Sequence, residues 1–441
     1  MTATTPSSRV PPPAAGDSIW RDGAFVRLWT ASSISYVGSF ITRTALPLAA
    51  IYLLEAGPIE ISALRSLELV GWLLVGLVAG AWVDRLRRRP VMIAADLGRA
   101  LLLGSIPIAA IAGVLTLAQL IVVAFLAATL STFFNSASKA YLPTIISRSR
   151  LIAANSAMSA SGSAAEFTGF ALSGFLIQIL TAPIAIAIDA ISFVASALLL
   201  ATIRRREPPR PAVADREPVL HEIREGIRVV IRTPILRSLA AAHAANHILW
   251  GVFGATYLLF ATHEVGLGPA AIGVIAALGG IGSLVGATIT GRLVRRFGVG
   301  RTMAVAVVVM SVGDAMIPLA PSGAVVIGAA FLIGQQLIGD SAGTVYEVVE
   351  RSVTQSIVDG RILGRVNATI EFVTTVLALV GSILGGVVGE VLGLRAALVV
   401  GVLGGATAIL FVWFSPVRSM RGIPGAATVS APRAEDLPLT E

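Results

Sequence analysis

The 441-residue sequence predicts an all-helical integral membrane protein with twelve transmembrane helices in two pseudo-symmetric bundles of six. The first observation is composition, because 55% of the residues are hydrophobic and only 13% are charged. A soluble domain carries about 25% charged residues, so this chain must present apolar surface to lipid. The second and third observations are a series of apolar segments of spanning length and a loop motif that occurs twice.

Twelve apolar segments are long enough to cross a bilayer, since about 20 residues span about 30 Å of hydrocarbon. Several contain a proline (Pro47, Pro107 and Pro318), which bundled membrane helices tolerate. No stretch shows the sustained period-two alternation of a membrane β-barrel. The predicted spans are 27–53, 61–83, 91–112, 116–138, 152–180, 183–203, 235–261, 269–291, 302–320, 323–347, 365–389 and 394–414.

The loops between these segments differ sharply in positive charge. Those after spans 1, 3, 5, 7, 9 and 11 contain no lysine or arginine, whereas the opposite set is rich in both. Positive loops remain on the cytoplasmic side. We therefore expect a multi-pass protein of the inner (plasma) membrane with both termini in the cytoplasm. The positive residues are Arg85, Arg87, Arg88, Arg89, Lys139, Arg148, Arg150, Arg204–Arg206, Arg292, Arg295, Arg296, Arg301, Arg351 and Arg361.

The chain divides into two bundles, a linker and two tails. Both tails are rich in small residues and proline, which predicts disorder. In the linker, Ile223, Ile227 and Ile231 recur at helical spacing among arginines, which predicts a short interfacial helix. The alternative is a solvated charged linker. The predicted parts are a tail (1–23), a bundle (24–203), the linker (204–234), a second bundle (235–415) and a tail (416–441).

An internal duplication relates the two bundles. GAWVDRLRRRP begins at Gly80 and GRLVRRFGVGR begins at Gly291, 211 residues later. Asn155 and Asn367 match at an offset of 212. Two six-helix halves in parallel orientation are a known arrangement of secondary transporters.

At the same offset, two charged positions of the first half carry the opposite charge in the second half. Asp84 corresponds to Arg295, and Lys139 corresponds to Glu350, so both signs are exchanged together. Either order gives an attractive pair if the two positions touch within each half. We hypothesise two ion-pair latches, Asp84–Lys139 and Arg295–Glu350.

The first copy of the motif resembles the loop 2–3 signature of the major facilitator superfamily, G-x-x-x-D-R-x-G-R-R. Its second glycine is replaced here by Arg87, and the second copy is a degenerate form. FVRLWTASSISYVGS, MIAADLGRALLL, LPTIISRSRLIAANSAMSAS and RILGRVNA are similar to the enterobactin-exporter and macrolide-efflux branch. The matching residues are Gly80, Asp84, Arg85, Arg88 and Arg89 in the first copy and Gly291, Arg296 and Gly298 in the second.

This resemblance implies alternating access, in which the two halves rock about a site near the middle of the membrane. It implies that spans 1, 2, 4, 5, 7, 8, 10 and 11 line the cavity, while spans 3, 6, 9 and 12 pack outside. It also implies that the loop 2–3 motif stabilises the outward-facing state, with Asp84 near the N-terminus of span 11. A carboxylate is favoured there by the helix dipole.

Ionisable residues at hydrocarbon depth are costly and point to function. Arg43, Glu68 and Glu166 fall on spans expected to line the cavity, and Arg43 could pair with either carboxylate. One hypothesis is that Glu166 titrates during transport, with Arg43 setting its pKa. The other is a static Arg–Glu pair that holds the helices together.

Spans 7 and 10 add further candidates. Gln335 and Asp340 could form hydrogen bonds in the cavity or a second proton site, and His243 and His247 share a helix face at four-residue spacing. The histidines could sense pH or could be neutral and hydrogen-bonded. We interpret as structural the intrahelical pair Asp96–Arg99, Asp189 and Asp314.

Several functions are disfavoured. The chain has no cysteine, its four histidines lack metal-ligand spacing, and no P-loop occurs, so we expect no enzyme activity, cofactor or metal. The prediction is a monomeric proton-coupled antiporter of the multidrug-resistance type, which exports an amphipathic drug, macrolide or siderophore and contacts lipid but no nucleic acid. Sodium coupling, uptake by symport or facilitated diffusion, and a non-transporting receptor or regulator remain alternatives.

Overall fold

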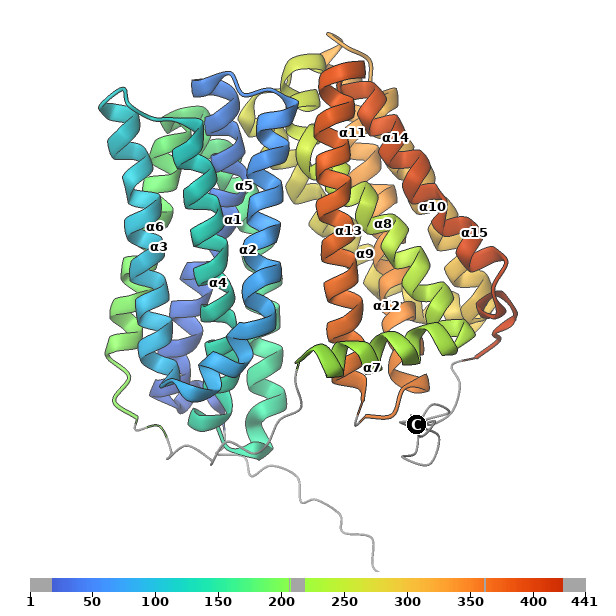
Figure 1. The fold of residues 1–441 in the computed structure, drawn as a ribbon, viewed down its shortest axis with the longest axis horizontal. Coiled ribbons are helices and arrows are strands. Elements are labelled where there is room, and N and C mark those ends of the chain that lie inside the picture. The colour runs from blue at the N-terminus through green and yellow to red at the C-terminus, as the bar shows by residue number, and fades with distance from the viewer. Residues whose placement is uncertain (1–17, 206, 208–218, 361, 423–441) are drawn as a thin grey trace, which may run out of the picture.

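The computed structural model describes residues 18–205, 207, 219–360 and 362–422, but not the side chains of 75–85, 148 and 219–223. The N-terminal half is a bundle of six long helices joined by short connections (Figure 1). Asp22 begins the first of them, because its carboxylate accepts from the backbone N–H groups of Ala24 and Phe25. The helices are α1 (Gly23–Leu54), α2 (Pro58–Arg85), α3 (Arg88–Ile111), α4 (Leu117–Ile145), α5 (Leu151–Leu180) and α6 (Ala182–Ala201).

The C-terminal half repeats this bundle with three modified spans. Two continue through a π-helical turn, η3 or η4, and the last is divided between α14 and α15. The elements are α8 (Pro234–Leu259), η3 (Phe260–Glu264), α9 (Pro269–Phe297), α10 (Val299–Leu319), α11 (Val325–Gly334), η4 (Gln335–Gly339), α12 (Asp340–Ile357), α13 (Leu363–Leu392), α14 (Leu394–Ala406) and α15 (Ala408–Trp413).

The predicted membrane fold is confirmed. Among the described residues, eleven helical segments are long and apolar enough to span a bilayer. The 28-residue α2, whose side chains are only partly described, supplies the remaining predicted span. Several helices extend beyond the predicted segments, for example α12 to Ile357 rather than residue 347. Hydropathy marks the part of a helix that lies in hydrocarbon, whereas the hydrogen-bonded helix continues into water.

The backbone preserves the duplication at its turns. Glu55, Gly113 and Thr181 adopt positive φ where three helices end, and glycines adopt positive φ 211, 210 and 212 residues later, at Gly266, Gly323 and Gly393. A left-handed conformation disfavours residues with a side chain, so its recurrence at equivalent positions is informative. The two halves therefore share connection geometry as well as helix order.

Among the described residues, the two bundles contact each other near one end. They approach each other where α2 contacts α13 and α5 contacts α9, and they diverge toward the end that carries α7 (Val219–Arg232) (Figure 1). We call the first the closed end and the second the arginine-rich end, since most of the basic loops lie there. At the closed end Ser62 Oγ donates to the Ser382 carbonyl at 2.7 Å.

The closed end is not free of arginine. Arg395, at the start of α14, donates there to the carboxylate of Glu264 at 3.2 Å and to the Ala320 carbonyl at 2.9 Å. Arg65 lies two turns inside α2 and forms an ion pair with Glu68. Both guanidinium groups are thus balanced by a carboxylate, which reduces the cost of placing them near lipid.

The linker contains the helix α7, which lies across the ends of the C-terminal spans (Figure 1). Its Gly226 and Val229 are buried, and Val229 packs with residues of α13, while Ile231 is 56% exposed. Glu225 forms an ion pair with Arg365 at the start of α13. These contacts attach α7 to the second bundle. Its position at a membrane interface remains a prediction.

Candidate functional site

A cavity of about 1240 Å³ lies between the bundles. Its wall comes mainly from α1, α2, α4 and α5 on one side and from α8, α9, η4 and α12 on the other. The expected division of spans is partly wrong, because α3 and α6 also reach the cavity, through Arg99 and Asp189, whereas no residue of α13 is among those lining it in the described structure. Instead α13 packs against α2 and α8 at the closed end.

Six residues were predicted to take part in proton coupling or substrate binding, and five of them line this cavity. They come from α1, α2, α5 and η4–α12, which are distant in sequence. His247 is not part of the described cavity wall. The five are Arg43, Glu68, Glu166, Gln335 and Asp340.

The carboxylate of Glu68 has a different partner from the one expected. Arg65 Nη1 lies 2.6 Å from Glu68 Oε2, one turn away on α2. Arg43 lies within electrostatic range of Glu68 and Glu166 but forms no hydrogen bond or ion pair in the described part of the chain. Sequence reasoning missed Arg65, although its three-residue spacing from Glu68 in an apolar segment was the available signal.

A second polar group lies within the N-terminal bundle. Arg99 forms the expected ion pair with Asp96, and their side chains are 3% and 0% exposed. The Arg99 guanidinium also lies 4.0 Å from the Phe193 ring centre. Asp189 is fully buried, accepts from Thr42 of α1, and lies within electrostatic range of Arg99. Because Arg99 and Asp189 border the cavity, this group is connected to the site as well as to the core.

The C-terminal wall is shaped by the π-helical turn η4. The additional residue in such a turn reorients side chains, and π-turns are frequent at functional sites. Here Gln335 Nε2 lies 3.4 Å from Asp340 Oδ1, and Gln336 Nε2 donates to the Ile275 carbonyl of α9 at 3.2 Å. Gly279 leaves the space that Asp340 occupies, since a Cβ there would overlap the carboxylate.

Asp314 on α10 lies behind this turn. It is 5% exposed and within electrostatic range of Asp340. Two carboxyl groups thus flank Gln335, and the described residues place no arginine, lysine or histidine in the cavity wall formed by this half. Asp314, which we interpreted as structural from the sequence, therefore lies next to a candidate site residue.

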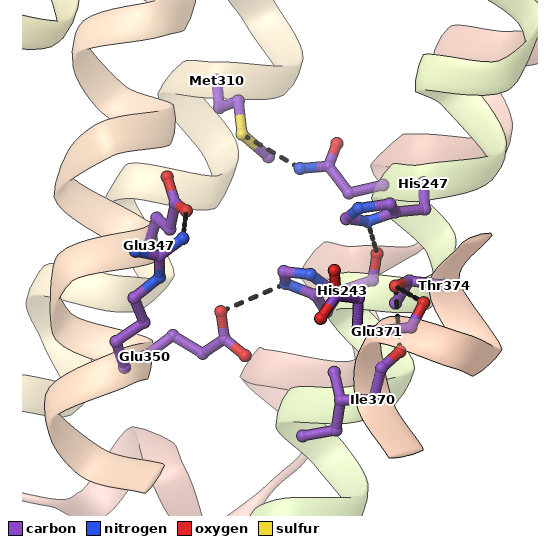
Figure 2. A network of polar contacts seen from close by, with 10 residues as sticks. His243, His247, Met310, Glu347, Glu350, Ile370, Glu371 and Thr374 are labelled. Atoms are coloured by element: carbon purple, nitrogen blue, oxygen red, sulfur yellow. Dashed lines mark hydrogen bonds and ion pairs between the residues drawn. The ribbon is translucent and has the colours of Figure 1, made fainter. Parts of the chain in front are cut away.

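His243 and His247 belong to a separate network that joins α8 to α12 and, through Asn246 and Met310, to α10 (Figure 2). His243 Nδ1 lies 3.1 Å from Glu350 Oε2, His247 Nδ1 lies 2.9 Å from the His243 carbonyl, and the two rings stack. Glu350 is thus bound to His243 in this conformation and forms no described ion pair with Arg295. Glu347 pairs instead with Arg351.

The loop 2–3 motif is described only in part. Gly80, Asp84 and Arg85 lie outside the described side chains, so the Asp84–Lys139 latch is untested. The carboxylate of Glu207 accepts from the backbone N–H groups of Arg88 and Arg89, both at 2.9 Å. In the second copy, Arg296 lies over the Phe297 ring, and Gly291 has the Arg295 guanidinium nearby.

Two duplicated six-helix bundles around a cavity that is closed at one end define a membrane transporter. The chain belongs to the Major Facilitator Superfamily, whose family model matches residues 28–334 and 239–435. The uncharacterized MFS-type transporter YfiS of Bacillus subtilis (strain 168) is 25% identical over 318 residues, which cover 71% of each chain.

Solved structures share the fold at low identity. A bacterial homologue of the iron transporter ferroportin in its inward-facing state is 17% identical and aligns with a TM-score of 0.72 over 90% of this chain and 99% of that one. Its outward-facing state, at 18% identity over 88% and 98%, gives 0.57. The nucleoside transporter NupG is 14% identical with a TM-score of 0.68 over 88% and 97%.

Proposed function

We propose that this transporter exports an amphipathic small molecule across the inner membrane by alternating access, in exchange for protons. The arginine-rich end is cytoplasmic in this proposal, so the structure represents the inward-facing state. The observation that carries the proposal is a cavity lined by carboxylates and aromatic side chains, between two bundles that contact each other near one end and diverge toward the other. Aromatic rings suit an apolar cargo, and carboxylates can carry protons.

The branch remains part of the proposal. Resemblance to enterobactin and macrolide exporters favours export. The structural relatives do not select a cargo, because one is named for iron transport and another for nucleoside transport. Efflux, antiport and multidrug resistance therefore depend on the sequence resemblance and on the chemistry of the cavity.

Glu166 is our candidate proton carrier near the middle of α5. Its side chain is exposed to the cavity and forms no hydrogen bond or ion pair among the described residues, which argues against a static pair with Arg43. If this carboxyl group is exposed to each side of the membrane in turn, proton entry is coupled to substrate exit.

Glu166→Gln is expected to abolish proton-driven transport, because the amide cannot release a proton. The measurement is uptake of a fluorescent cation such as ethidium into liposomes that contain the purified protein, under an imposed pH gradient. Exchange of ethidium without a gradient should persist. Glu390→Gln, on the exposed end of α13, serves as the matched control. Undiminished gradient-driven uptake in Glu166→Gln would refute this assignment.

The orientation can be tested directly, since the chain has no cysteine and single-cysteine variants report without background. A cysteine at exposed Arg204 is expected to react with a membrane-impermeant maleimide only after the cells are permeabilised. A cysteine at exposed Gly113, near the closed end, should react in intact cells. The reverse pattern would overturn the proposed topology.

The two latches remain proposals for the opposite conformational state. The Arg295–Glu350 pair would form when Glu350 leaves His243 as the arginine-rich ends come together. Asp84–Lys139 would be its counterpart in the first half. Such pairs contribute more than exposed ones because water is partly excluded from them.

A further inference from the structure

We propose that the cargo is an amphipathic organic cation, and that its positive group binds Asp340 on the C-terminal wall of the cavity in place of a proton. This inference rests on the proposed export function and specifies its substrate class. Three features carry it: the balance of charge around the cavity, the surroundings of Asp340, and the aromatic side chains that line the same cavity.

Carboxyl groups outnumber cations around the cavity. Three arginines lie in or directly behind its described walls, against six carboxyl groups. Burying an uncompensated carboxylate is costly, so the surplus must be neutralised by protons or by a bound cation. The arginines are Arg43, Arg65 and Arg99, and the carboxyl groups belong to Glu68, Glu166, Asp96, Asp189, Asp314 and Asp340.

The surplus is concentrated on the C-terminal side. The N-terminal arginines have nearby acids: Arg65 pairs with Glu68, Arg99 pairs with Asp96, and Arg43 lies near Glu166. An anionic cargo would therefore meet two guanidinium groups that are already paired, and a third, that of Arg43, which has two carboxylates within electrostatic range. Across the cavity, Asp340 is the single charged residue that the described C-terminal wall presents.

No element packed against Asp340 supplies a described cation. The groups that face it are Tyr257 of α8, Asp314 of α10 and Glu166 of α5, and Gln335 of η4 contacts it directly. Gly279 of α9 approaches it with backbone only. The Gln335 amide can donate one hydrogen bond to the carboxylate, which leaves its other oxygen available to a proton or an ammonium group.

Aromatic rings line the same cavity, and Tyr257 lies within electrostatic range of Asp340. Trp250 and Tyr257 of α8 and Phe167 of α5 line the cavity, and Trp250 is 53% exposed. Their π-faces attract organic cations, and the same rings offer apolar surface to the rest of the molecule. A carboxylate among aromatic rings therefore suits a cation with a bulky apolar body.

Competition at Asp340 would add a second exchange of substrate for proton, besides the proton that Glu166 is proposed to carry. The organic cation and the proton both neutralise one carboxylate, and in this inference they do so in turn. Binding of the cation then releases the proton to solution, and the O–H bond of the carboxyl group is replaced by an ion pair. No other reactant is required.

Tetraphenylphosphonium and tetraphenylborate provide the test, because they have nearly the same shape and opposite charge. Binding to the purified full-length protein can be followed by fluorescence of Trp72 and Trp250, both of which line the cavity. The cation should bind and the anion should not. Asp340→Asn should weaken binding of the cation by about 30-fold or more, as for loss of one partner of a buried charge pair.

Two controls keep the outcome interpretable. Glu390→Gln removes one negative charge from the same half outside the cavity and should leave affinity unchanged. If Asp340→Asn does not fold, proton release by the unmodified protein still tests the inference. Tetraphenylphosphonium should release about one proton per bound cation into weakly buffered solution. Equal binding of the two ions, unchanged affinity in a folded Asp340→Asn, or no proton release would overturn the inference.

Failure here differs from failure of the proposed function. If tetraphenylphosphonium binds and releases a proton but liposomes show no gradient-driven transport, the cation site stands and proton-coupled export falls. If gradient-driven transport of ethidium occurs while a folded Asp340→Asn binds tetraphenylphosphonium like the parent protein, export stands and the Asp340 site falls.

Discussion

Gly386→Leu is expected to hold the closed end apart and to reduce transport to background. Gly386 of α13 packs against the start of α2, where a Cβ would lie 2.6 Å from Ser62 Oγ and 3.1 Å from the Pro58 carbonyl oxygen. Overpacking at such a contact costs about 3 kcal/mol, which shifts the closed-to-open equilibrium by about 100-fold. The substitution should therefore populate a state that is open at this end.

The shift can be measured as a distance between spin labels. Cysteines at Ile111 on α3 and Val326 on α11, which are 88% and 82% exposed near the closed end, would carry the labels. Their separation should increase in Gly386→Leu. Gly404→Leu on α14, where nothing lies within 4 Å of the added Cβ, should leave both distance and transport unchanged. Normal transport by Gly386→Leu would show that this helix contact is not part of the cycle.

Arg99→Met is expected to destabilise the N-terminal bundle by about 3–5 kcal/mol, because it leaves the buried carboxylate of Asp96 without its partner. The guanidinium also lies 4.7 Å and 4.0 Å from the ring centres of Phe134 and Phe193, so it joins α3 to α4 and α6. Denaturant unfolding in mixed micelles measures the loss.

The double variant Asp96→Asn/Arg99→Met separates charge from packing. Removing both charges should restore much of the stability, since replacing both partners of a buried pair is often close to neutral. Arg292→Met, on the exposed surface of α9, should change the unfolding free energy little. If Arg99→Met unfolds like the parent protein, the pair does not hold these helices together.

The structure brings five of the predicted site residues together in one cavity but gives some of them other partners than expected. Arg43, Glu68, Glu166, Gln335 and Asp340 share one cavity, because an ionisable or amide group at hydrocarbon depth avoids lipid and faces the interior. Segment hydropathy gives a residue's depth but not the direction in which its helix turns it. For this reason Asp189 was taken as structural although it borders the cavity.

Partners were harder to predict than locations. Glu350 was expected to pair with Arg295 because their charges are exchanged relative to Asp84 and Lys139, but in this conformation its carboxylate meets His243 (Figure 2). The sequence alone does not show which of its possible contacts form in one particular conformation. The π-turn η4 was also unpredicted, because one additional residue per turn leaves no clear mark in an apolar segment.

The sequence by itself determined the membrane fold, the helix count and the duplication. These follow from local quantities, namely the length of apolar segments, the side on which arginines occur, and motifs at a constant offset. Only the tertiary structure decided which end is closed, that Arg65 pairs with Glu68, and that Asp340 shares a cavity with aromatic side chains. Those facts depend on the rotation of each helix and on the relative position of the two halves, which arise from packing between residues far apart in the chain.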